Sequence, residues 1–378
     1  MAHNSINLNA NIAFTAQFPY NISPKIYLGF PNMSIITANV PLRHIGPVKI
    51  IGPEVNDDVL VPLATYESPL WPSTNRGAKV SNLSGGIKAV ILDDRMTRSV
   101  LLEAPDAVYA AEIINYLRER MNEMQAVVRK TSRFAKLFEF HTQVTGNLLF
   151  LRFSYTCGDA AGHNMATNAS QHIVDWILSE YPQIHYVSLS GNYCTDKKVS
   201  AVNGILGRGK SVVAEIVIPH HVVETVLHTT PKKIVDLNIK KNLIGTINAG
   251  GVRTANAHFA NILLALYLAT GQDAANIIEG SQGITYAEVR GDDLYFSVTV
   301  PNIIVGTIGN GKDLDFVQEN LRELGCLEKR APGANARRLA IITAATVLCG
   351  ELSLMAALTN SHELMRAHIL FERKKHHD

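Results

Sequence analysis

The sequence has few cysteines and little net charge. Its 378 residues include four cysteines, Cys157, Cys194, Cys326 and Cys349, which lie far apart and form no CxxC pair. Neither a zinc site nor a disulfide framework is therefore expected, and a reducing cytoplasm fits this cysteine usage best. The formal net charge of +2 points to no strongly charged partner.

Basic clusters, targeting segments and long uninterrupted apolar runs are also scarce. The one dense basic stretch, 373–377, is interpreted as a solvated tail, so no nucleic-acid partner is expected. The N-terminus has no basic region followed by a long apolar run, and no signal peptide is predicted. The longest apolar run, Leu339 to Leu358, contains Glu351 and follows two arginines. It predicts a buried helix and no membrane association.

The composition that remains is that of an ordinary globular enzyme. Apolar residues make up 47% of the chain and charged residues 18%, which allows a sizeable core. The length favours two domains, or one domain with a large insertion. Residues 104–188 have the pattern helix, two strands, helix, strand, which predicts an α+β unit of the size of a small domain. Its expected elements are a helix at 104–124, strands FAKLFEFHTQV and NLLFLRFSYTC joined by Thr145-Gly146-Asn147, a helix at 164–180 and a strand in HYVSLSG.

Strands and helices are mixed in the rest of the chain. The first 60 residues are interpreted as strands and loops, with extended pieces KIYLGF, PVKIIGP and DVLVPLA. Further along we expect a strand VVAEIVI, a helical segment at 220–242, a helix from Ala255 to Thr270, another opening at Gln272-Asp273, a hairpin of ITYAEV and DLYFSVTV, and a helical block from Asn335 to about Phe371.

The stretch GILGRGKS, residues 204–211, fits the phosphate-loop pattern G-x-x-x-x-G-K-[ST]. Such a loop follows a strand and opens a helix, whose N-terminus meets the phosphate. Here a polar segment precedes the pattern and the predicted strand VVAEIVI follows it. A glycine turn leading into a strand is therefore favoured, and a nucleotide-triphosphate hydrolase is kept as a minor alternative.

Polar clusters interrupt apolar surroundings at many points, and each alone has a structural explanation at least as good as a functional one. The motifs are PLATYES and STNRG (62–77), DDRMTR (93–98), TSRFAKL (131–137), GDAAGHNM (158–165), SGNYCTDKK with GRGKSVV (190–213), KKNLIGT (240–246), NAHFANI (256–262), GQDAAN (271–276), GTIGNGK (306–312), GELSLMAAL (350–358) and His368. In this order they resemble the 3-hydroxy-3-methylglutaryl-coenzyme A (HMG-CoA) reductase family over roughly residues 60 to 373.

The resemblance implies an α+β fold with two domains. A large mixed α/β domain, residues 1–99 and 189–378, would bind CoA and the hydroxymethylglutaryl part, with 1–60 as its divergent N-terminal portion. A small ferredoxin-like α+β domain, residues 100–188, would be inserted into it and bind NADP(H). The segment GDAAGHNM is no GxGxxG, so a Rossmann fold is not implied.

The implied reaction is the four-electron reduction of (S)-HMG-CoA to (R)-mevalonate and CoA, through mevaldyl-CoA and mevaldehyde, without a metal. Lys197 would stabilise the oxyanion formed by hydride attack on the thioester. His368 would protonate the departing thiolate, and Glu67 the oxygen of mevaldehyde. Asp273 is expected between Glu67 and Lys197, where it could separate their protonation equilibria.

The resemblance also assigns binding residues. Those expected to hold the hydroxymethylglutaryl part are Arg98, Ser190, Asp196, Lys198, Lys241, His258 and Asn261, and those expected to contact CoA are Ser73, Asn75 and Arg76. Cofactor contacts are expected from Ser132, Arg133, Phe134, Asp159, Ala160, Gly162, Asn164, Gly306, Thr307 and Gly309. An arginine beside a serine suits a 2′-phosphate, so NADPH is favoured and NADH is kept as possible.

The chain departs from the family pattern in places. Segment 38–42, ANVPL, stands where the family has its E-N-V-I-G dimer motif, although a homodimer or homotetramer with shared active sites is still expected. His163 stands where methionine is usual, and it is either a cofactor contact or an ordinary loop residue. An NAD-linked enzyme that oxidises mevalonate is the main alternative. The hypothesis of a non-catalytic relative used for binding is weakened, because Glu67, Lys197, Asp273 and His368 are all present.

Overall fold

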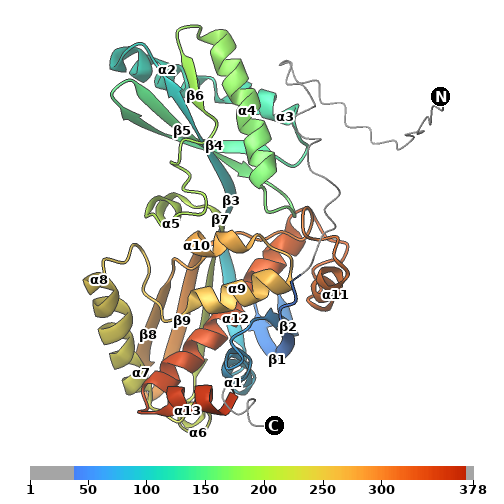
Figure 1. The fold of residues 1–378 in the computed structure, drawn as a ribbon, viewed down its shortest axis with the longest axis vertical. Coiled ribbons are helices and arrows are strands. Elements are labelled where there is room, and N and C mark those ends of the chain that lie inside the picture. The colour runs from blue at the N-terminus through green and yellow to red at the C-terminus, as the bar shows by residue number, and fades with distance from the viewer. Residues whose placement is uncertain (1–37, 372–378) are drawn as a thin grey trace, which may run out of the picture. The chain divides into compact units, whose positions relative to one another are not determined.

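The computed structural model describes residues 38–371, except for the side chains of Ala367, His368 and Phe371 (Figure 1). The expected basic tail at 373–377 and the extended piece KIYLGF at 25–30 lie outside the described residues. The description below concerns the unit that begins at Val40.

A mixed β-sheet carries the larger of two hydrophobic cores. Among the described strands, only β1 and β3 pair in parallel along the main path of the sheet, and its other neighbours are antiparallel. The strand order is β2 (Asn56–Ala64), β1 (Leu42–Ile51), β3 (Ile87–Glu103), β7 (Gly209–Ile218), β9 (Asp293–Ile303) and β8 (Ile284–Arg290). Alternating burial along β7 indicates that one face of the strand packs on the core.

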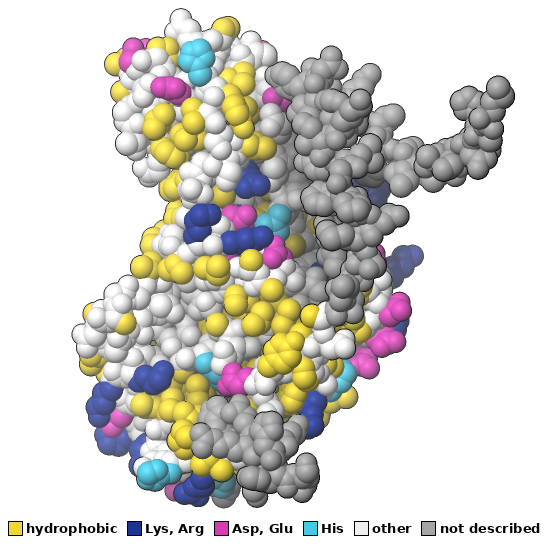
Figure 2. Space-filling model, viewed as in Figure 1, with side chains coloured by type: hydrophobic (Ala, Val, Ile, Leu, Met, Phe, Trp, Pro, Cys, Tyr) yellow, Lys and Arg dark blue, Asp and Glu magenta, His cyan; other side chains and the backbone are white. Residues whose placement is uncertain are grey.

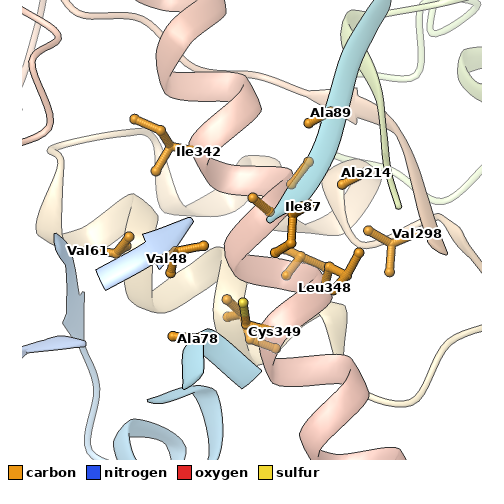
Figure 3. Packing of buried hydrophobic residues seen from close by; sticks show 14 of the residues in the cluster. Val48, Val61, Ala78, Ile87, Ala89, Ala214, Val298, Ile342, Leu348 and Cys349 are labelled. Atoms are coloured by element: carbon orange, nitrogen blue, oxygen red, sulfur yellow. The ribbon is translucent and has the colours of Figure 1, made fainter. Parts of the chain in front are cut away.

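The helix α12 (Ala334–Leu358) is the centre of this core. It packs against α1 (Leu70–Leu83), α9 (Phe259–Ala269) and the strands β7 and β9. Figure 3 shows Leu348 and Cys349 of this helix beside Ile87 of β3 and Ala78 of α1. By length and composition α12 could cross a membrane, but 94% of its apolar window is buried inside the structure. The predicted buried helix is therefore confirmed.

A second core lies between residues 96 and 184, with Ile304 added from the loop after β9. It is covered by strands in the order β6 (His185–Ser188), β3, β5 (Leu148–Thr156) and β4 (Lys136–Thr145), all antiparallel. The helices α2 (Ala107–Glu119), α3 (Met121–Arg129) and α4 (His163–Glu180) contribute its other side chains. The long strand β3, whose course Figure 1 shows, contributes buried side chains to both cores.

The remaining elements lie between or after the strands. They are α5 (Val202–Leu206), α6 (His220–Leu227), α7 (Pro231–Leu237), the π-helix η2 (Asn238–Gly245), α8 (Thr246–Asn248), the short 3-10 helix η3 (Ala274–Asn276), α10 (Ile277–Gly280), α11 (Asp315–Glu323) and α13 (Glu363–Phe371).

Most predicted elements are confirmed, but several boundaries are wrong. The helical segment expected at 220–242 is interrupted at 228–230. The helix expected at 104–124 is divided at Arg120, and the final helical block is interrupted at 359–362. The helix expected from Ala255 begins only at Phe259. The residues before it bond elsewhere, since Asn256 Nδ2 donates to the carbonyls of Ser281 and Gly283, both at 3.1 Å.

Residues 204–211 do not have the geometry of a phosphate loop. Their first part lies in α5, and the strand β7 already begins at Gly209. Lys210 is only 4% exposed, and its Nζ lies 3.3 Å from Asp94 Oδ1. The order is helix, turn, strand, which is the reverse of what phosphate binding by such a loop needs. The turn interpretation is confirmed, although the strand starts earlier than expected.

Candidate active site

Figure 2 shows basic, acidic and histidine side chains gathered midway along the molecule. A cavity of about 560 Å³ gathers residues expected in three different roles. We call it the lysine cavity. The expected catalytic residues Lys197 and Asp273 line it together with the expected substrate residues Arg98 and Asp196. It is also lined by Ala160, Ala161, Gly162, His163, Asn164, Met165, Gln272, Ile308, Gly309, Asn310 and Lys312.

Lys197 and Asp273 form an ion pair in this cavity. Lys197 Nζ lies 2.6 Å from Asp273 Oδ2, and the two side chains are 39% and 45% exposed. The hydrogen bond to Asp273 raises the pKa of Lys197. Burial alone would raise the pKa of Asp273, but the bonds from Lys197 and from the Ala275 N–H outweigh it and lower that pKa. Both side chains are therefore charged at neutral pH.

The side chain of Asp273 has a second role in local structure. It is the N-cap of η3, and its Oδ1 accepts a hydrogen bond from Ala275 N at 3.1 Å. Capping fixes the carboxylate where Lys197 meets it.

The side chain of Asp196, next to Lys197, is fixed by a buried arginine. Its Oδ1 accepts a hydrogen bond from Arg208 Nη2 at 2.6 Å. Burial alone would raise the pKa of Asp196, but Arg208 outweighs this effect and lowers it. The Arg208 side chain is buried and also donates to the carbonyl of Thr97 at 2.5 Å. This arginine therefore ties the Asp196–Lys197 turn to β3.

His163 lies in the lysine cavity at the start of α4. Its Nε2 is 3.7 Å from Asp196 Oδ1 and makes no hydrogen bond to a described residue. Burial, followed by the nearby Arg208, lowers its pKa to about 4. A neutral imidazole therefore faces the cavity at neutral pH.

The expected cofactor residues divide into three groups, of which Ser132, Arg133 and Phe134 lie apart from the lysine cavity. Ala160, Gly162, Asn164 and Gly309 line the lysine cavity. Three others join the loop before α4 to the loop after β9: Asp159, Gly306 and Thr307.

The contacts of these three residues are with backbone. Thr307 N donates to Asp159 O at 2.8 Å, and the Asp159 carboxylate accepts from Gly333 N and Ala336 N at the start of α12, at 2.9 and 3.0 Å. A Cβ on Gly306 would lie 2.3 Å from Ala161 N, so only glycine fits there. The expected roles as direct contacts of Asp159, Gly306 and Thr307 stay predictions.

Ser132 and Arg133 line a separate cavity of about 530 Å³, which we call the arginine cavity. Two further basic side chains, Arg129 and Lys136, line it too. Ser132 Oγ accepts from the backbone of Phe134 and Ala135 at 3.1 and 3.3 Å. Phe134 does not line this cavity, but its ring lies 4.7 Å below the guanidinium of Arg133.

A third cavity, of about 380 Å³, contains Glu67, and we call it the glutamate cavity. Asn261 Nδ2 donates to Glu67 Oε2 at 2.9 Å. His258 also lines the cavity, and its Nε2 lies 2.9 Å from Gly350 O. Ser73 lines it next to Arg76, and Ser73 Oγ donates to Ser353 Oγ at 3.1 Å.

The expected CoA residues lie on α1, and one of them, Arg76, contacts the C-terminal helix α13. Arg76 Nη1 lies 2.7 Å from Glu363 Oε1, in the first turn of α13. The neighbouring Asn75 accepts from Gly46 N at 2.9 Å and lines an adjacent cavity with Arg43 and Trp71. His368 belongs to α13, but its side chain lies outside the described residues.

Within one chain the structure does not bring every expected residue together. Glu67 lines the glutamate cavity, whereas Lys197 and Asp273 line the lysine cavity. Residues 192–198 form a turn, which we call the lysine turn. Ser190, just before this turn, and Lys198, at its end, are exposed, and Lys241 lies on η2. These three residues line none of the three named cavities. The placement of Asp273 between Glu67 and Lys197 stays a prediction.

Several buried polar residues around the lysine cavity were not foreseen. Gln272 exchanges two hydrogen bonds with Gly306, at 2.9 and 3.0 Å, and so joins the two motifs GQDAAN and GTIGNGK. Lys312 is buried and donates to the carbonyl of Gly271. Glu279 is buried behind Lys197. The position of Gln272 and Lys312 inside two matching motifs was the one signal available for them.

Comparison with solved structures defines the class of fold. A class II HMG-CoA reductase from Streptococcus pneumoniae bound to NADPH superposes with a TM-score of 0.69 at 17% identity, covering 89% of this chain and 89% of that one. Another structure of the enzyme from the same organism has a TM-score of 0.68 at 18% identity, with 88% and 77% covered. At this identity the likeness shows a shared α+β fold alone.

Sequence comparison gives the family. A sequence model described as hydroxymethylglutaryl-coenzyme A reductase matches residues 20–373. The HMG-CoA reductase of Pyrococcus abyssi is 45% identical over 359 residues, covering 94% of this chain and 87% of the relative. That of Aeropyrum pernix is 46% identical over 336 residues, covering 88% and 79%. The chain belongs to the hydroxymethylglutaryl-coenzyme A reductase family, a family of oxidoreductases.

Proposed function

We propose that the protein reduces (S)-HMG-CoA to (R)-mevalonate and CoA with two molecules of NADPH, through mevaldyl-CoA and mevaldehyde. One observation carries the proposal: the Lys197–Asp273 pair lies in one cavity with Ala160, Gly162 and Gly309, which match the cofactor segments of the family. The residues fit such a cofactor, because small side chains line the cavity and His163 Nε2 makes no hydrogen bond to a described residue. NADPH would supply the hydride for both reductions.

Lys197 is the group best suited to stabilise the oxyanion on the thioester carbon. Its raised pKa keeps the ammonium charged, and Asp273 holds its Nζ at 2.6 Å in a fixed direction. A cation that is already oriented stabilises developing charge without reorganisation at the moment of reaction. Arg98 and Asp196 in the same cavity would orient the hydroxymethylglutaryl part.

The glutamate cavity and α13 would provide the remaining groups. Glu67 would protonate the mevaldehyde oxygen, and Asn261 fixes its carboxylate. His368 would protonate the CoA thiolate from α13. Arg76 currently pairs with Glu363, and a CoA phosphate arriving at Arg76 would compete with that carboxylate.

The arginine cavity supports NADPH as the preferred cofactor. Arg129, Arg133 and Lys136 surround Ser132, a donor set suited to a 2′-phosphate that NADH lacks. The alternative, an NAD-linked enzyme that oxidises mevalonate, predicts the reverse preference. Comparing kcat/KM for NADPH and NADH in both directions separates the two. A ratio favouring NADH, unchanged in Arg133→Ala, would contradict the NADPH assignment.

We also infer that residues 100–188 form the expected ferredoxin-like cofactor domain inserted in the large domain. The order β-α-β-β-α-β along the chain and the antiparallel strand order β6-β3-β5-β4 support this inference. Expression of the chain with 100–188 removed tests it. Loss of NADPH binding with CoA binding retained is expected.

The separation of Glu67 from Lys197 supports an active site completed by two copies of the chain. Hydrophobic side chains are exposed along η2 and α8, among them Ile247 at 75%, Ile244 at 51% and Ile239 at 45%. Lys241, an expected substrate contact, belongs to the same segment. A homodimer or homotetramer would cover this surface and bring Lys241 and Glu67 into shared sites.

Mixing two inactive variants tests the shared site. In a dimer, Glu67→Gln and Lys197→Ala chains would form one intact site per hybrid, so random mixing restores about one quarter of the wild-type activity. Activity that stays at the level of the separate variants, with hybrids shown by native mass spectrometry, would mean that each chain carries a whole site.

The proposed reaction is tested by following NADPH absorbance after addition of HMG-CoA to the wild type, Lys197→Ala and the control Lys232→Ala. Lys232 is 82% exposed, in an outlying ion pair on α7. We expect substrate-dependent oxidation in the wild type and the control, with strong loss in Lys197→Ala. No substrate-dependent oxidation in the wild type would overturn the proposal. The cytoplasmic location and the absence of metal, membrane and nucleic-acid partners stay predictions.

A further inference from the structure

The backbone that carries Lys197 is held in an unusual conformation. Lys197 has φ of 56° and Thr195 has φ of 44°, the left-handed region that side chains other than glycine rarely adopt. Each such residue destabilises the folded chain unless other contacts compensate for it. Within the turn, Thr195 N donates to Asn192 O at 2.9 Å and Lys198 N to Thr195 O at 3.3 Å. A conformation of this kind persists only where surrounding groups fix it.

Glu279 supplies such a fixed group. It lies on the short helix α10 and its side chain is 0% exposed. Its Oε1 accepts a hydrogen bond from Lys197 N at 3.2 Å and another from Asn276 Nδ2 at 2.9 Å. Its Oε2 is buried and has no hydrogen-bond partner among the described residues. Burial raises the pKa of Glu279. A buried carboxylate is costly to retain for packing alone, because leucine or methionine would fill the same space.

Arg208 is the buried cation nearest to Glu279, and it links Glu279 to Asp196, the residue before Lys197 in the turn. Arg208 Nε lies 3.7 Å from Glu279 Oε1, and the Arg208 side chain is 2% exposed. The same guanidinium donates to Asp196 Oδ1 at 2.6 Å. Glu279 therefore holds the backbone of Lys197 directly, and the side chain of Asp196 through one buried arginine.

We propose that Glu279 is a positioning residue for the reduction: its buried carboxylate fixes the left-handed backbone of Lys197, so that the ammonium reaches both Asp273 and the reacting carbonyl. This inference rests on the proposed function for its effect on turnover, but not for its effect on the Lys197 backbone. Glu279 lies behind the lysine turn and does not line the lysine cavity, so it acts through Lys197.

The chemistry of the contact predicts how two substitutions differ. The Lys197 N–H requires an acceptor, which the carbonyl oxygen of Glu279→Gln keeps and Glu279→Ala lacks. Glu279→Ala also leaves buried Arg208 with Asp196 as its one remaining acidic partner among the described residues. A displacement of a reacting group by about 1 Å costs roughly 10²-fold in rate. We therefore expect kcat to fall about 100-fold in Glu279→Ala and less than about 5-fold in Glu279→Gln, with the KM for NADPH unchanged in both.

Amide hydrogen exchange at residues 192–200 gives a second readout that does not depend on turnover. The Lys197 amide should be protected in the wild type and in Glu279→Gln, and should exchange faster in Glu279→Ala. Glu351 is a matched control for stability, since it is also buried and accepts backbone N–H bonds, from Ala257 at 2.7 Å and His258 at 3.1 Å. Glu351→Ala should lower the melting temperature without changing exchange at Lys197.

The outcomes separate this inference from the proposed function. If Glu279→Ala keeps kcat within about twofold and keeps Lys197 protected, the inference is wrong. The same holds if Glu279→Gln loses as much kcat and protection as Glu279→Ala. If Glu279→Ala does not fold, the double variant Arg208→Met/Glu279→Met replaces the buried pair by apolar side chains; wild-type protection of Lys197 in that variant would overturn the inference. If the wild type is inactive but amide exchange at Lys197 still depends on the residue at position 279, the proposed function is wrong and this inference stands.

Discussion

The substitution Asp273→Asn should separate the catalytic role of the Lys197–Asp273 pair from any structural role. Asparagine keeps the shape of the side chain and is as good an N-cap as aspartate. The bond that Asp273 Oδ1 accepts from Ala275 N at 3.1 Å can therefore remain. What the substitution removes is the negative charge 2.6 Å from Lys197 Nζ.

The effect on stability should be small. At 2.6 Å, two unit charges attract by about 1.6 kcal/mol in a medium of water-like dielectric constant. With side chains 39% and 45% exposed, screening and lost side-chain freedom reduce the net contribution to about 0.2–1 kcal/mol. We expect the melting temperature to fall by no more than about 3 °C.

The pH range of this contribution follows from the direction of the two pKa shifts. The pKa of Asp273 is lowered from 3.8, so its contribution is present above that value and is lost as pH falls through the folded-state pKa. The pKa of Lys197 is raised from 10.5, so its contribution is present below that value and is lost as pH rises through the folded-state pKa. Between these limits the stability difference between wild type and Asp273→Asn should not change with pH.

The effect on turnover should be large. Without the carboxylate, Lys197 loses the partner that orients its ammonium, and kcat should fall about 10²- to 10³-fold. Asp236→Asn is a matched control, because Asp236 is also 45% exposed and lies 3.8 Å from a lysine, Lys232, on α7. It should keep wild-type kcat. The reasoning is refuted if Asp273→Asn retains kcat within about threefold, or if its melting temperature falls by more than about 6 °C, since that would indicate a structural role.

Three further predictions concern other parts of the site. Burial lowers the pKa of Lys312 from 10.5 to about 8. The protonated side chain therefore destabilises the folded protein below pH 8, and the free energy of unfolding increases as pH rises from about 8 to 10.5. Urea unfolding should therefore find Lys312→Met more stable than wild type at pH 7, with the gap closing between pH 8 and 10.5; a gap independent of pH would contradict this. In Gly306→Ala the new Cβ would lie 2.3 Å from Ala161 N. The substitution should lower the free energy of unfolding by about 1–3 kcal/mol in the same assay and weaken NADPH binding in a fluorescence titration. Unchanged stability would show that the loops of Ala161 and Gly306 can move apart without cost. Arg76→Ala should raise the KM for HMG-CoA about tenfold, whereas Glu363→Gln, which frees Arg76, should lower it; equal KM values in steady-state kinetics would mean that Arg76 does not meet CoA.

Local chemistry explains why parts of the fold could be predicted from sequence. The β4–β5 hairpin is marked by Thr145-Gly146-Asn147, and Gly146 has the positive φ of 61° that the turn requires. The helix α12 is apolar on all sides, which is typical of a helix buried in a core. Both features are contained in a few neighbouring residues, so no tertiary information was needed.

The long strand β3 was missed for a physical reason. Its centre, DDRMTR at 93–98, is polar, which interrupts the alternating pattern of a half-buried strand. Arg98 in this stretch faces the lysine cavity, and Arg95 pairs with Asp93 at 2.5 Å. Hydrophobic periodicity therefore fails to indicate this strand, because the polar residues that serve the site interrupt the pattern.

The site itself depends on contacts between residues far apart in sequence. No pattern near Lys197 indicates that it meets Asp273, and only the resemblance to a family suggested that pair. Glu279 in the segment NIIEGS has the sequence character of a surface residue, yet tertiary packing buries it completely. Burial of a polar side chain is decided by the elements that cover it, which a single segment does not reveal.

The stoichiometry of the reaction tests the central claim most directly. NADPH oxidation and release of free CoA thiol are measured together after a limiting amount of HMG-CoA is added to the wild type. A two-step reduction that retains the aldehyde in the site predicts two NADPH oxidised for each thiol released, with mevalonate as the product. One NADPH per thiol with free mevaldehyde, or thiol release without NADPH oxidation, would contradict the account.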